Sequence, residues 1–522
     1  MEENKLYKTL IICVLVLGSL LLCNFIPRVT LRGFELKGID LLADIRNDLN
    51  SEETNHHLQI PHSNVFDLTY LPYFRGFTPY LTASQGISPL FAQSGFSVNS
   101  ESAKKQLIFR EKGKQGVILK LLSPDFEVGS LFRDYSPDGN SFRKFFKVLN
   151  DIKRGDEKGR IAFFGDSFIE GDIFCADLRN SLQDIFGGNG VGFVPITSEV
   201  AQYRITIGHT FSGFHSYSVV NKVNTYEPFG PGGYCFTTLQ DNDVTYSANP
   251  KFKHLDLFHD IRLYYTSPEN TIFKYRFNNS DLKEVKIVSS DRLQQKEFKG
   301  VNASTVSFSF PASDTLKLYG ASFEDSTGIY VDNFGLRGNS GLGLSHISEG
   351  MHLQFNQYRN YQLIILQYGL NVIAPDTKDL GWYVNPMISV IERLKRCYPE
   401  AAILLMSVSD RSTRIDGQYR TMESVPLMVE AQREIARKTQ IAFYNLFEAM
   451  GGENSMVSFV ESDPPLANKD YTHLNYLGGR RVAGVFLKSL IHEFQKYNDQ
   501  NKKANDAVSA LVVSTDQLRP AS

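Results

Sequence analysis

The stretch RIAFFGDSFIEGDIFCADLRNSL, residues 160–182, decides the fold of this chain. It opens with the apolar run 161–164, continues with Gly165-Asp166-Ser167, and then carries apolar residues at helical spacing from Ile173 to Leu182. This pattern is typical of a strand, a tight turn and a helix. Ser167 would then lie at the carboxyl end of a strand and near a helix N-terminus, where backbone N–H groups favour developing negative charge. Since Gly, Asp and Ser are also ordinary turn residues, the tripeptide alone does not establish a nucleophile.

The same alternation of strands and helices returns late in the chain. Apolar segments at 361–366, 401–406 and 441–444 read as buried strands, a helix is expected at 427–438, and a final helix at 477–497. Residues 329–342, IYVDNFGLRGNSGL, read as a strand followed by a glycine-rich loop. We therefore predict an α/β fold with a parallel sheet flanked by helices.

Polar residues follow several of these predicted strands or precede the last helix. They are Gly338, Asn371, Asp470 and His473. The carboxyl ends of parallel strands meet at one crevice, so these residues are expected to lie near Ser167 although they are distant in the chain. That arrangement would suit an enzyme of acyl transfer.

The chemistry assigns each residue a role. Ser167 needs a base to take its proton, and His473 would be that base and would later protonate the leaving alcohol. Asp470 would hold the imidazole tautomer and stabilise its charged form. The backbone N–H groups of Ser167 and Gly338 and the side-chain amide of Asn371 are the candidate oxyanion donors. This chemistry requires no cofactor and no metal.

Each of these residues also has a structural interpretation. Asp470 could cap the last helix, and His473 could be a surface residue near the start of that helix. Asn371 could cap or turn, and Gly338 stands in a loop with four glycines. Their occurrence together, in this order and at predicted strand ends, favours a catalytic site.

The segment 201–328 has a different pattern. Short stretches rich in β-branched and aromatic residues alternate with Gly, Pro, Asn and Asp turns. This spacing predicts a β-sandwich, inserted between the first part of the α/β domain (141–200) and its second part (329–497). Residues 27–140 are expected to be an elaboration packed on that domain, and the polar tail 498–522 is expected to be disordered.

An almost unbroken apolar run covers residues 9–26 and follows a short leader, 1–8. Its length is close to the roughly 20 residues of a membrane-spanning helix, so we expect a transmembrane anchor. A cleaved signal peptide is the alternative, but no small-x-small site follows the run. The charges on the two sides of the run do not fix its orientation.

Composition limits the function classes. With 522 residues, two or three domains are expected, and a net charge of −2 with a pI near 6.6 gives no basic footprint for nucleic acid. Two of the five cysteines lie in the apolar run, and the other three, Cys175, Cys235 and Cys397, have neither metal-ligand nor paired spacing.

The chain resembles the SGNH (GDSL-type) hydrolases. Gly165-Asp166-Ser167, the Gly338 loop, the Gly-Leu-Asn that ends at Asn371, and Asp470-x-x-His473 look like the four blocks of that family, in their order. A closer similarity is to bacterial peptidoglycan O-acetylesterases, through GNGVGFVP at 188–195, the Gly-x-x-Gly loop at 335–338 and FYNLFEAMGGENSM at 443–456. The resemblance implies serine-dependent removal of O-acetyl groups from a glycan and an inserted domain like a carbohydrate-binding module.

Two positions depart from the family pattern. The third block often reads Gly-x-Asn-Asp, whereas Val372 follows Asn371 here, which removes a supporting carboxylate. In the second block, Gly341 is the family glycine under a shifted alignment, with Gly338 the preferred choice.

We therefore expect a serine esterase that removes O-acetyl groups from a cell-envelope glycan, with peptidoglycan as the preferred substrate. It would be anchored in the bacterial inner membrane, with its catalytic domain in the periplasm. The alternatives are an O-acetyltransferase of a surface polysaccharide that uses the same site, and a glycan-binding protein with a weak esterase site.

Overall fold

The computed structural model describes residues 131–155, 157–221 and 227–516, with side chains up to residue 503. It also describes four two-residue strands closer to the N-terminus, β1 (Thr30–Leu31), β2 (Phe34–Glu35), β3 (Leu107–Ile108) and β4 (Ile118–Leu119). The predicted anchor, residues 9–26, lies outside this part of the chain. Among the described residues, no helix is both long and apolar enough to cross a membrane. The chain divides into two compact units, Met1–Arg75 and Gly76–Ser522, and the second holds both large sheets.

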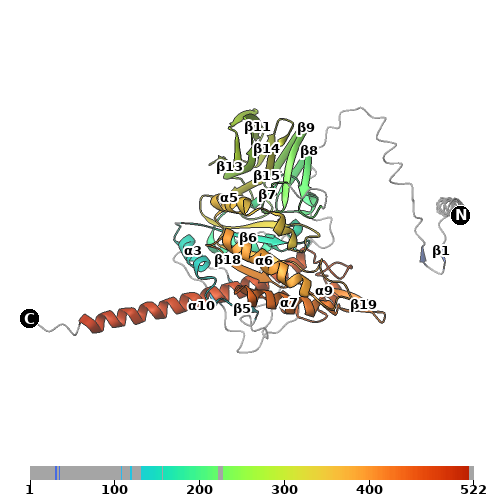
Figure 1. The fold of residues 1–522 in the computed structure, drawn as a ribbon, viewed down its shortest axis with the longest axis vertical. Coiled ribbons are helices and arrows are strands. Elements are labelled where there is room, and N and C mark those ends of the chain that lie inside the picture. Colours follow the sequence, from blue (N-terminus) through green and yellow to red (C-terminus); the bar gives the residue numbers. More distant parts are fainter. Residues whose placement is uncertain are drawn as a thin grey trace, which may run out of the picture. The chain divides into compact units, whose positions relative to one another are not determined.

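A six-stranded sheet forms the centre of this unit (Figure 1). Its strand order is β16-β6-β17-β18-β21-β5, in which the first five strands are parallel and β5 is antiparallel. The strands are β5 (Phe132–Asp134), β6 (Lys158–Gly165), β16 (Gly328–Gly335), β17 (Leu363–Gln367), β18 (Ala402–Met406) and β21 (Ala442–Tyr444). The predicted parallel α/β sheet is therefore present, and its strands coincide with the apolar runs seen in the sequence.

Helices cover both faces of this sheet because its strands are apolar on both sides. Within β6, Ile161 and Phe163 pack into one hydrophobic cluster, and Ala162 and Phe164 pack into the other. The first cluster includes residues of α3 (Arg143–Arg154), α4 (Cys175–Phe186), α8 (Leu446–Met450), α9 (Ser455–Glu461) and α10 (Tyr476–Asp516). The second includes residues of α5 (Glu349–Arg359), α6 (Gly381–Cys397) and α7 (Ser424–Lys438).

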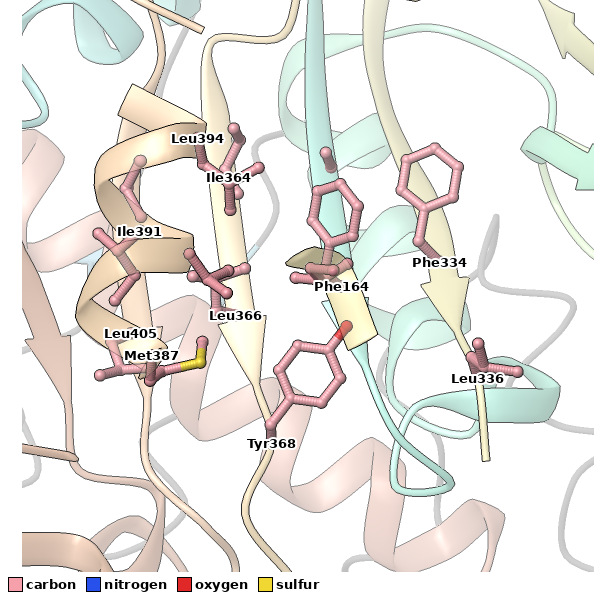
Figure 2. Close-up of a cluster of buried hydrophobic side chains, with 14 of the residues drawn as sticks. Phe164, Phe334, Leu336, Ile364, Leu366, Tyr368, Met387, Ile391, Leu394 and Leu405 are labelled. Atoms are coloured by element: carbon pink, nitrogen blue, oxygen red, sulfur yellow. The ribbon is translucent and has the colours of Figure 1, made fainter. Parts of the chain in front are cut away.

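Figure 2 shows the second cluster, in which α6 packs against the sheet. Met387, Ile391 and Leu394 lie one helical turn apart and face the strand residues Ile364 and Leu366. All five side chains are almost completely buried. This packing fixes β17, and with it the loop that carries Asn371.

The second large sheet has nine antiparallel strands. Seven follow the order β12-β11-β14-β9-β15-β10-β13, while β7 pairs with β15 and β8 pairs with β9. The strands are β7 (Gly192–Pro195), β8 (Gly208–Ser218), β9 (Tyr234–Ser247), β10 (Asp260–Ser267), β11 (Thr271–Phe277), β12 (Lys283–Ile287), β13 (Ser290–Phe298), β14 (Thr305–Ser309) and β15 (Ser313–Glu324).

The sequence predicted a β-sandwich here, and the structure has the antiparallel strands of that prediction, hydrogen-bonded into one continuous network. Register shifts interrupt two of the pairings: β8 shifts against β9 between Ser212 and Phe214, and β15 shifts against β9 between Ser313 and Leu318. Such irregularities bend long strands and let them pair with different neighbours along their length.

Three predicted boundaries also differ from the structure. Strand β5 joins the central sheet, although it falls in the segment 27–140 that was expected to be an elaboration; three residues are too few to show a strand pattern. Strand β7 belongs to the antiparallel sheet rather than to the first part of the α/β domain, 141–200. Helix α10 extends to Asp516 into the predicted disordered tail, because neither Gly nor Pro interrupts the sequence between Gly484 and Asp516.

Buried ion pairs join the two sheets. Glu324, at the end of β15, accepts hydrogen bonds from Arg160 of β6 at 3.0 and 2.8 Å. Arg359, at the end of α5, pairs with Glu324 and also with Asp332 of β16 at 2.6 Å. Burial alone would raise the pKa of Glu324, but Arg160 and Arg359 outweigh it and hold the pKa well below its usual value. Buried charged groups thus fix the antiparallel sheet to the central sheet, because a buried charge that loses its partner is strongly destabilising.

Candidate active site

Ser167 stands two residues after the end of β6, in the turn that leads to α4. Its Oγ lies 3.0 Å from Nε2 of His473, although 306 positions separate the two residues. The sheet explains this encounter, because β6 is a central strand and α10, which follows His473, packs on α4. The structure therefore brings together the predicted nucleophile and the predicted base at hydrogen-bond distance.

Asp470 holds the other side of the His473 ring. Its Oδ2 lies 2.7 Å from Nδ1 of His473, and its Oδ1 accepts the backbone N–H groups of Thr472 and His473 at 3.0 Å each. Burial pushes the pKa of Asp470 upward, but the hydrogen bonds donated by His473 and Thr472 lower it below its usual value. An ionised Asp470 holds a proton on Nδ1 and leaves Nε2 free to accept one from Ser167.

Asn371 follows β17 and lies against the nucleophile turn. Its Nδ2 donates to Oδ2 of Asp166 at 3.1 Å and to the backbone oxygen of Asn339 at 3.3 Å. Asp166 is buried, and its Oδ1 also accepts the N–H of Phe168 at 2.9 Å. Burial raises the pKa of Asp166 to about 6, against the lowering effect of these hydrogen bonds. Asp166 thus orients Asn371, a role that the sequence pattern did not reveal.

The two candidate glycines have different surroundings. At Gly338, with φ at +73°, an added Cβ would meet no atom within 4 Å, and its neighbour Arg337 lines the cavity that contains Ser167. At Gly341, with φ at +90°, an added Cβ would meet the ring of Tyr368 at 3.0 Å. Gly341 therefore faces the protein core, and the position of Gly338 suits the predicted donor better.

A cavity of about 500 Å³ opens beside Ser167. Among the residues that line it are Asn371, His473, Tyr203, Arg337 and Glu170. Arg337 donates from Nε to Glu170 at 2.7 Å; burial raises the pKa of Glu170, and Arg337 opposes this rise. Neither this ion pair nor the role of Tyr203 could be predicted from the sequence, since residues from separate loops leave no local pattern.

A buried polar cluster centred on Asp172 supports the turn that carries Ser167. Asp172 accepts two hydrogen bonds from Arg179 of α4, at 2.9 and 3.1 Å, and others from Asn333 at 2.9 Å and Thr206 at 2.7 Å. Burial favours a higher pKa for Asp172, but Arg179 and Arg204 lower it far below its usual value. This cluster ties the turn to β16 and to the loop that precedes β8. Among the described side chains, no group of three or more His, Cys, Asp or Glu residues is arranged to hold a metal ion.

The sequence matches no protein-family model, and no curated protein matches it significantly. Among solved structures, it is similar to a peptidoglycan O-acetylesterase, with a TM-score of 0.58, 21% identity and coverage of 70% of this chain and 99% of that chain. A family two carbohydrate esterase from Cellvibrio japonicus has a TM-score of 0.23 and 10% identity, over 55% of this chain and 99% of that one. The acetyl xylan esterase AlAXEase has a TM-score of 0.24 and 16% identity, over 31% of this chain and 81% of that one.

The first of these similarities establishes the fold. The chain shares the fold of a peptidoglycan O-acetylesterase over nearly the whole length of that enzyme. The parallel α/β fold that the four sequence blocks predicted is therefore present, with the serine, histidine and aspartate of those blocks in mutual contact.

Proposed function

We propose that this protein is a serine esterase that removes O-acetyl groups from a cell-envelope glycan, with peptidoglycan as the preferred substrate. The observation that carries the proposal is the hydrogen-bonded chain from Ser167 through His473 to Asp470 at the edge of a cavity. The shared fold with a peptidoglycan O-acetylesterase supports the choice of substrate.

In this reaction His473 takes the proton of the Ser167 hydroxyl as Oγ attacks the acetyl carbonyl carbon. The negative charge on the carbonyl oxygen is received by the N–H groups of Ser167 and Gly338 and by the Asn371 amide. When the carbon–oxygen bond to the sugar breaks, His473 returns the proton to the sugar hydroxyl and acetyl-Ser167 remains. Water, deprotonated by His473, then attacks this ester; as the bond to Oγ of Ser167 breaks, His473 returns the proton to Oγ, and acetate and free Ser167 are released.

Exposure of the base favours hydrolysis over transfer. The side chains of His473 and Asp470 are 42% and 49% exposed, so bulk water reaches the base directly. An acetyltransferase with the same residues would need to keep water away from its acyl-enzyme. The open site therefore supports an esterase.

The cavity wall supports a sugar as substrate. Tyr203 is 59% exposed, and it comes from the turn Ala201–Tyr203 that leads into β8 of the antiparallel sheet. The hydroxyl of Tyr476 donates to the backbone oxygen of Tyr203 and ties this turn to the start of α10. An exposed aromatic ring on a turn held in this way offers an apolar face to a pyranose ring while leaving the sugar hydroxyls in water.

The location of the enzyme belongs to the same proposal. The apolar run 9–26 would anchor it in the bacterial inner membrane, and the catalytic unit would act in the periplasm. A glycan substrate outside the cytoplasm would agree with this arrangement.

The test is acetate release by the full-length protein from O-acetylated peptidoglycan and from acetylated xylan, with Ser167→Ala as the control. We expect serine-dependent release, faster from peptidoglycan. Faster release from xylan would reassign the glycan, and release from both substrates that persists in Ser167→Ala would refute the serine mechanism. Acetyl transfer to an added unacetylated glycan, without free acetate, would identify a transferase instead.

A further inference from the structure

A β-hairpin that takes no part in the proposed chemistry touches both loops of the site. It consists of β19 (Ser412–Ile415) and β20 (Gln418–Thr421), and it lies between β18 and α7 in the chain. Arg411, just before β19, donates from Nη1 to the backbone oxygen of Leu370 at 3.2 Å. The N–H of Ser412 donates to the backbone oxygen of Tyr471 at 3.0 Å. Leu370 immediately precedes Asn371, and Tyr471 lies between Asp470 and His473.

The hairpin also contacts the Asp470–His473 loop through a pair of stacked aromatic rings. The rings of Tyr419 and Tyr471 are parallel, with centroids 3.6 Å apart and an angle of 8° between their planes. Tyr471 has φ at +54°, a left-handed conformation that is unfavourable for a side chain of this size. A residue keeps such a conformation only where its surroundings hold it there. Tyr419 and Ser412 supply that restraint from the hairpin.

The base of the hairpin is itself rigidly held. The hydroxyl of Thr421 donates to Oδ1 of the buried Asp410 at 2.9 Å, and Oδ2 of Asp410 accepts the N–H of Met456 in α9 at 2.8 Å. The N–H of Met422 donates to the backbone oxygen of Arg411 at 2.8 Å. These bonds connect the hairpin to α9. The hairpin residues that contact Tyr471 and Leu370 are therefore held in place by the rest of the fold.

We propose that this hairpin, residues 411–421, is a brace that holds the Asn371 loop and the Asp470–His473 loop in their catalytic positions. Tyr419 and Arg411 are its positioning residues: neither lines the cavity beside Ser167, and each acts through a loop that does. The kinetic part of this inference rests on the proposed esterase activity. Without the Tyr419 ring, Tyr471 would leave its left-handed conformation and His473 would spend less time within reach of Ser167.

The kinetic test compares full-length Tyr419→Ala, Tyr419→Phe and Arg420→Ala with the wild type. Arg420 is the adjacent exposed residue of the hairpin, and its Nη2 donates to Oε1 of Gln418 in the same strand at 3.3 Å. With p-nitrophenyl acetate, we expect Tyr419→Ala to lower kcat roughly tenfold with little change in KM, since small misplacements of reacting groups cost large factors in rate. Tyr419→Phe keeps the stacking ring and should restore kcat, and Arg420→Ala should be unchanged. A lower burst amplitude of p-nitrophenol with an unchanged kcat per active site would mean a merely structural role and would overturn the proposal.

Hydrogen exchange tests the brace without relying on activity. In Tyr419→Ala, backbone amides in the peptide 468–475 should exchange faster, while Tyr419→Phe and Arg420→Ala keep the wild-type rate. In Arg411→Met, faster exchange should appear in the peptide that contains Asn371. If the wild type releases no p-nitrophenol, the proposed function fails, and the exchange rates still decide on the brace. Unchanged exchange in both Tyr419→Ala and Arg411→Met would refute it.

Discussion

Replacing Asn371 by alanine removes two interactions: its proposed donation to the oxyanion and its hydrogen bond to Asp166. The amide of Asn371 already bonds Asp166 at 3.1 Å and the backbone oxygen of Asn339 at 3.3 Å. Donation to the oxyanion would exchange the longer of these bonds for a charge-assisted one, so the gain arises in the transition state. Loss of one such donor costs about 3 kcal/mol, or roughly 10²-fold in kcat, and KM should change little.

The same substitution leaves Oδ2 of the buried Asp166 without the Asn371 bond. That loss should lower the free energy of unfolding by about 1–3 kcal/mol. Asn356→Ala is the control: Asn356 is half-buried whereas Asn371 is exposed, and the Asn356 side chain bonds the backbone of Cys397 and of Tyr361, away from the cavity. It should lose a similar amount of stability and keep its kcat.

The assay is stopped-flow release of p-nitrophenol from p-nitrophenyl acetate, with urea unfolding of each variant. A slower acylation phase in Asn371→Ala, but not in Asn356→Ala, would support the donor role. If Asn371→Ala acylates within about twofold of the wild-type rate, a loss too small for an oxyanion donor, the backbone N–H groups suffice and the assignment is wrong. Equal losses of kcat in both variants would point to general destabilisation.

Three further predictions concern Tyr203, Asp166 and Arg359. Tyr203→Ala should raise KM for O-acetylated peptidoglycan several-fold and leave p-nitrophenyl acetate hydrolysis near the wild-type rate; equal effects on both substrates would contradict a sugar-binding role for its ring. The pKa of Asp166 is raised to about 6, so the folded state binds its proton more tightly than the unfolded state, and the free energy of unfolding should increase by up to about 3 kcal/mol as pH falls from about 6 to about 4. Asp166→Asn should remove that increase. Urea unfolding of both proteins over this pH range measures it, and an increase of the same size in Asp166→Asn would contradict its assignment to Asp166. Arg359→Met leaves the buried carboxylates of Glu324 and Asp332 short of a partner and should cost about 3–5 kcal/mol in urea unfolding; a loss below about 1 kcal/mol would show that these ion pairs contribute little.

The central sheet could be predicted because its strands are continuous apolar runs between turn residues. Ser167 and His473 could be proposed as partners because parallel strands bring their carboxyl ends to one edge. Strand β5 could not be found, since its three residues, Phe132–Asp134, include two charged ones and gain their place by pairing with β21. The pairing order of the nine antiparallel strands could not be predicted either, because register shifts within long strands have no signature in local composition.

Some supporting residues of the site were beyond sequence reasoning for a different reason. Asp166 was seen only as part of a turn, yet it holds the amide of Asn371 across 205 positions of the chain. Tyr419 looks like one more exposed aromatic residue until Tyr471 is placed against it. Such contacts depend on the tertiary fold, and no spacing in the sequence encodes them.

The most direct test of the account is covalent labelling of the full-length protein with a fluorophosphonate, followed by peptide mapping. A nucleophile activated by His473 should carry the label on the peptide that contains Ser167, in proportion to the loss of p-nitrophenyl acetate hydrolysis. His473→Ala should block both labelling and hydrolysis while the protein remains folded. Labelling at another serine that removes activity, or full hydrolysis by a protein whose Ser167 is completely labelled, would contradict the proposed serine mechanism.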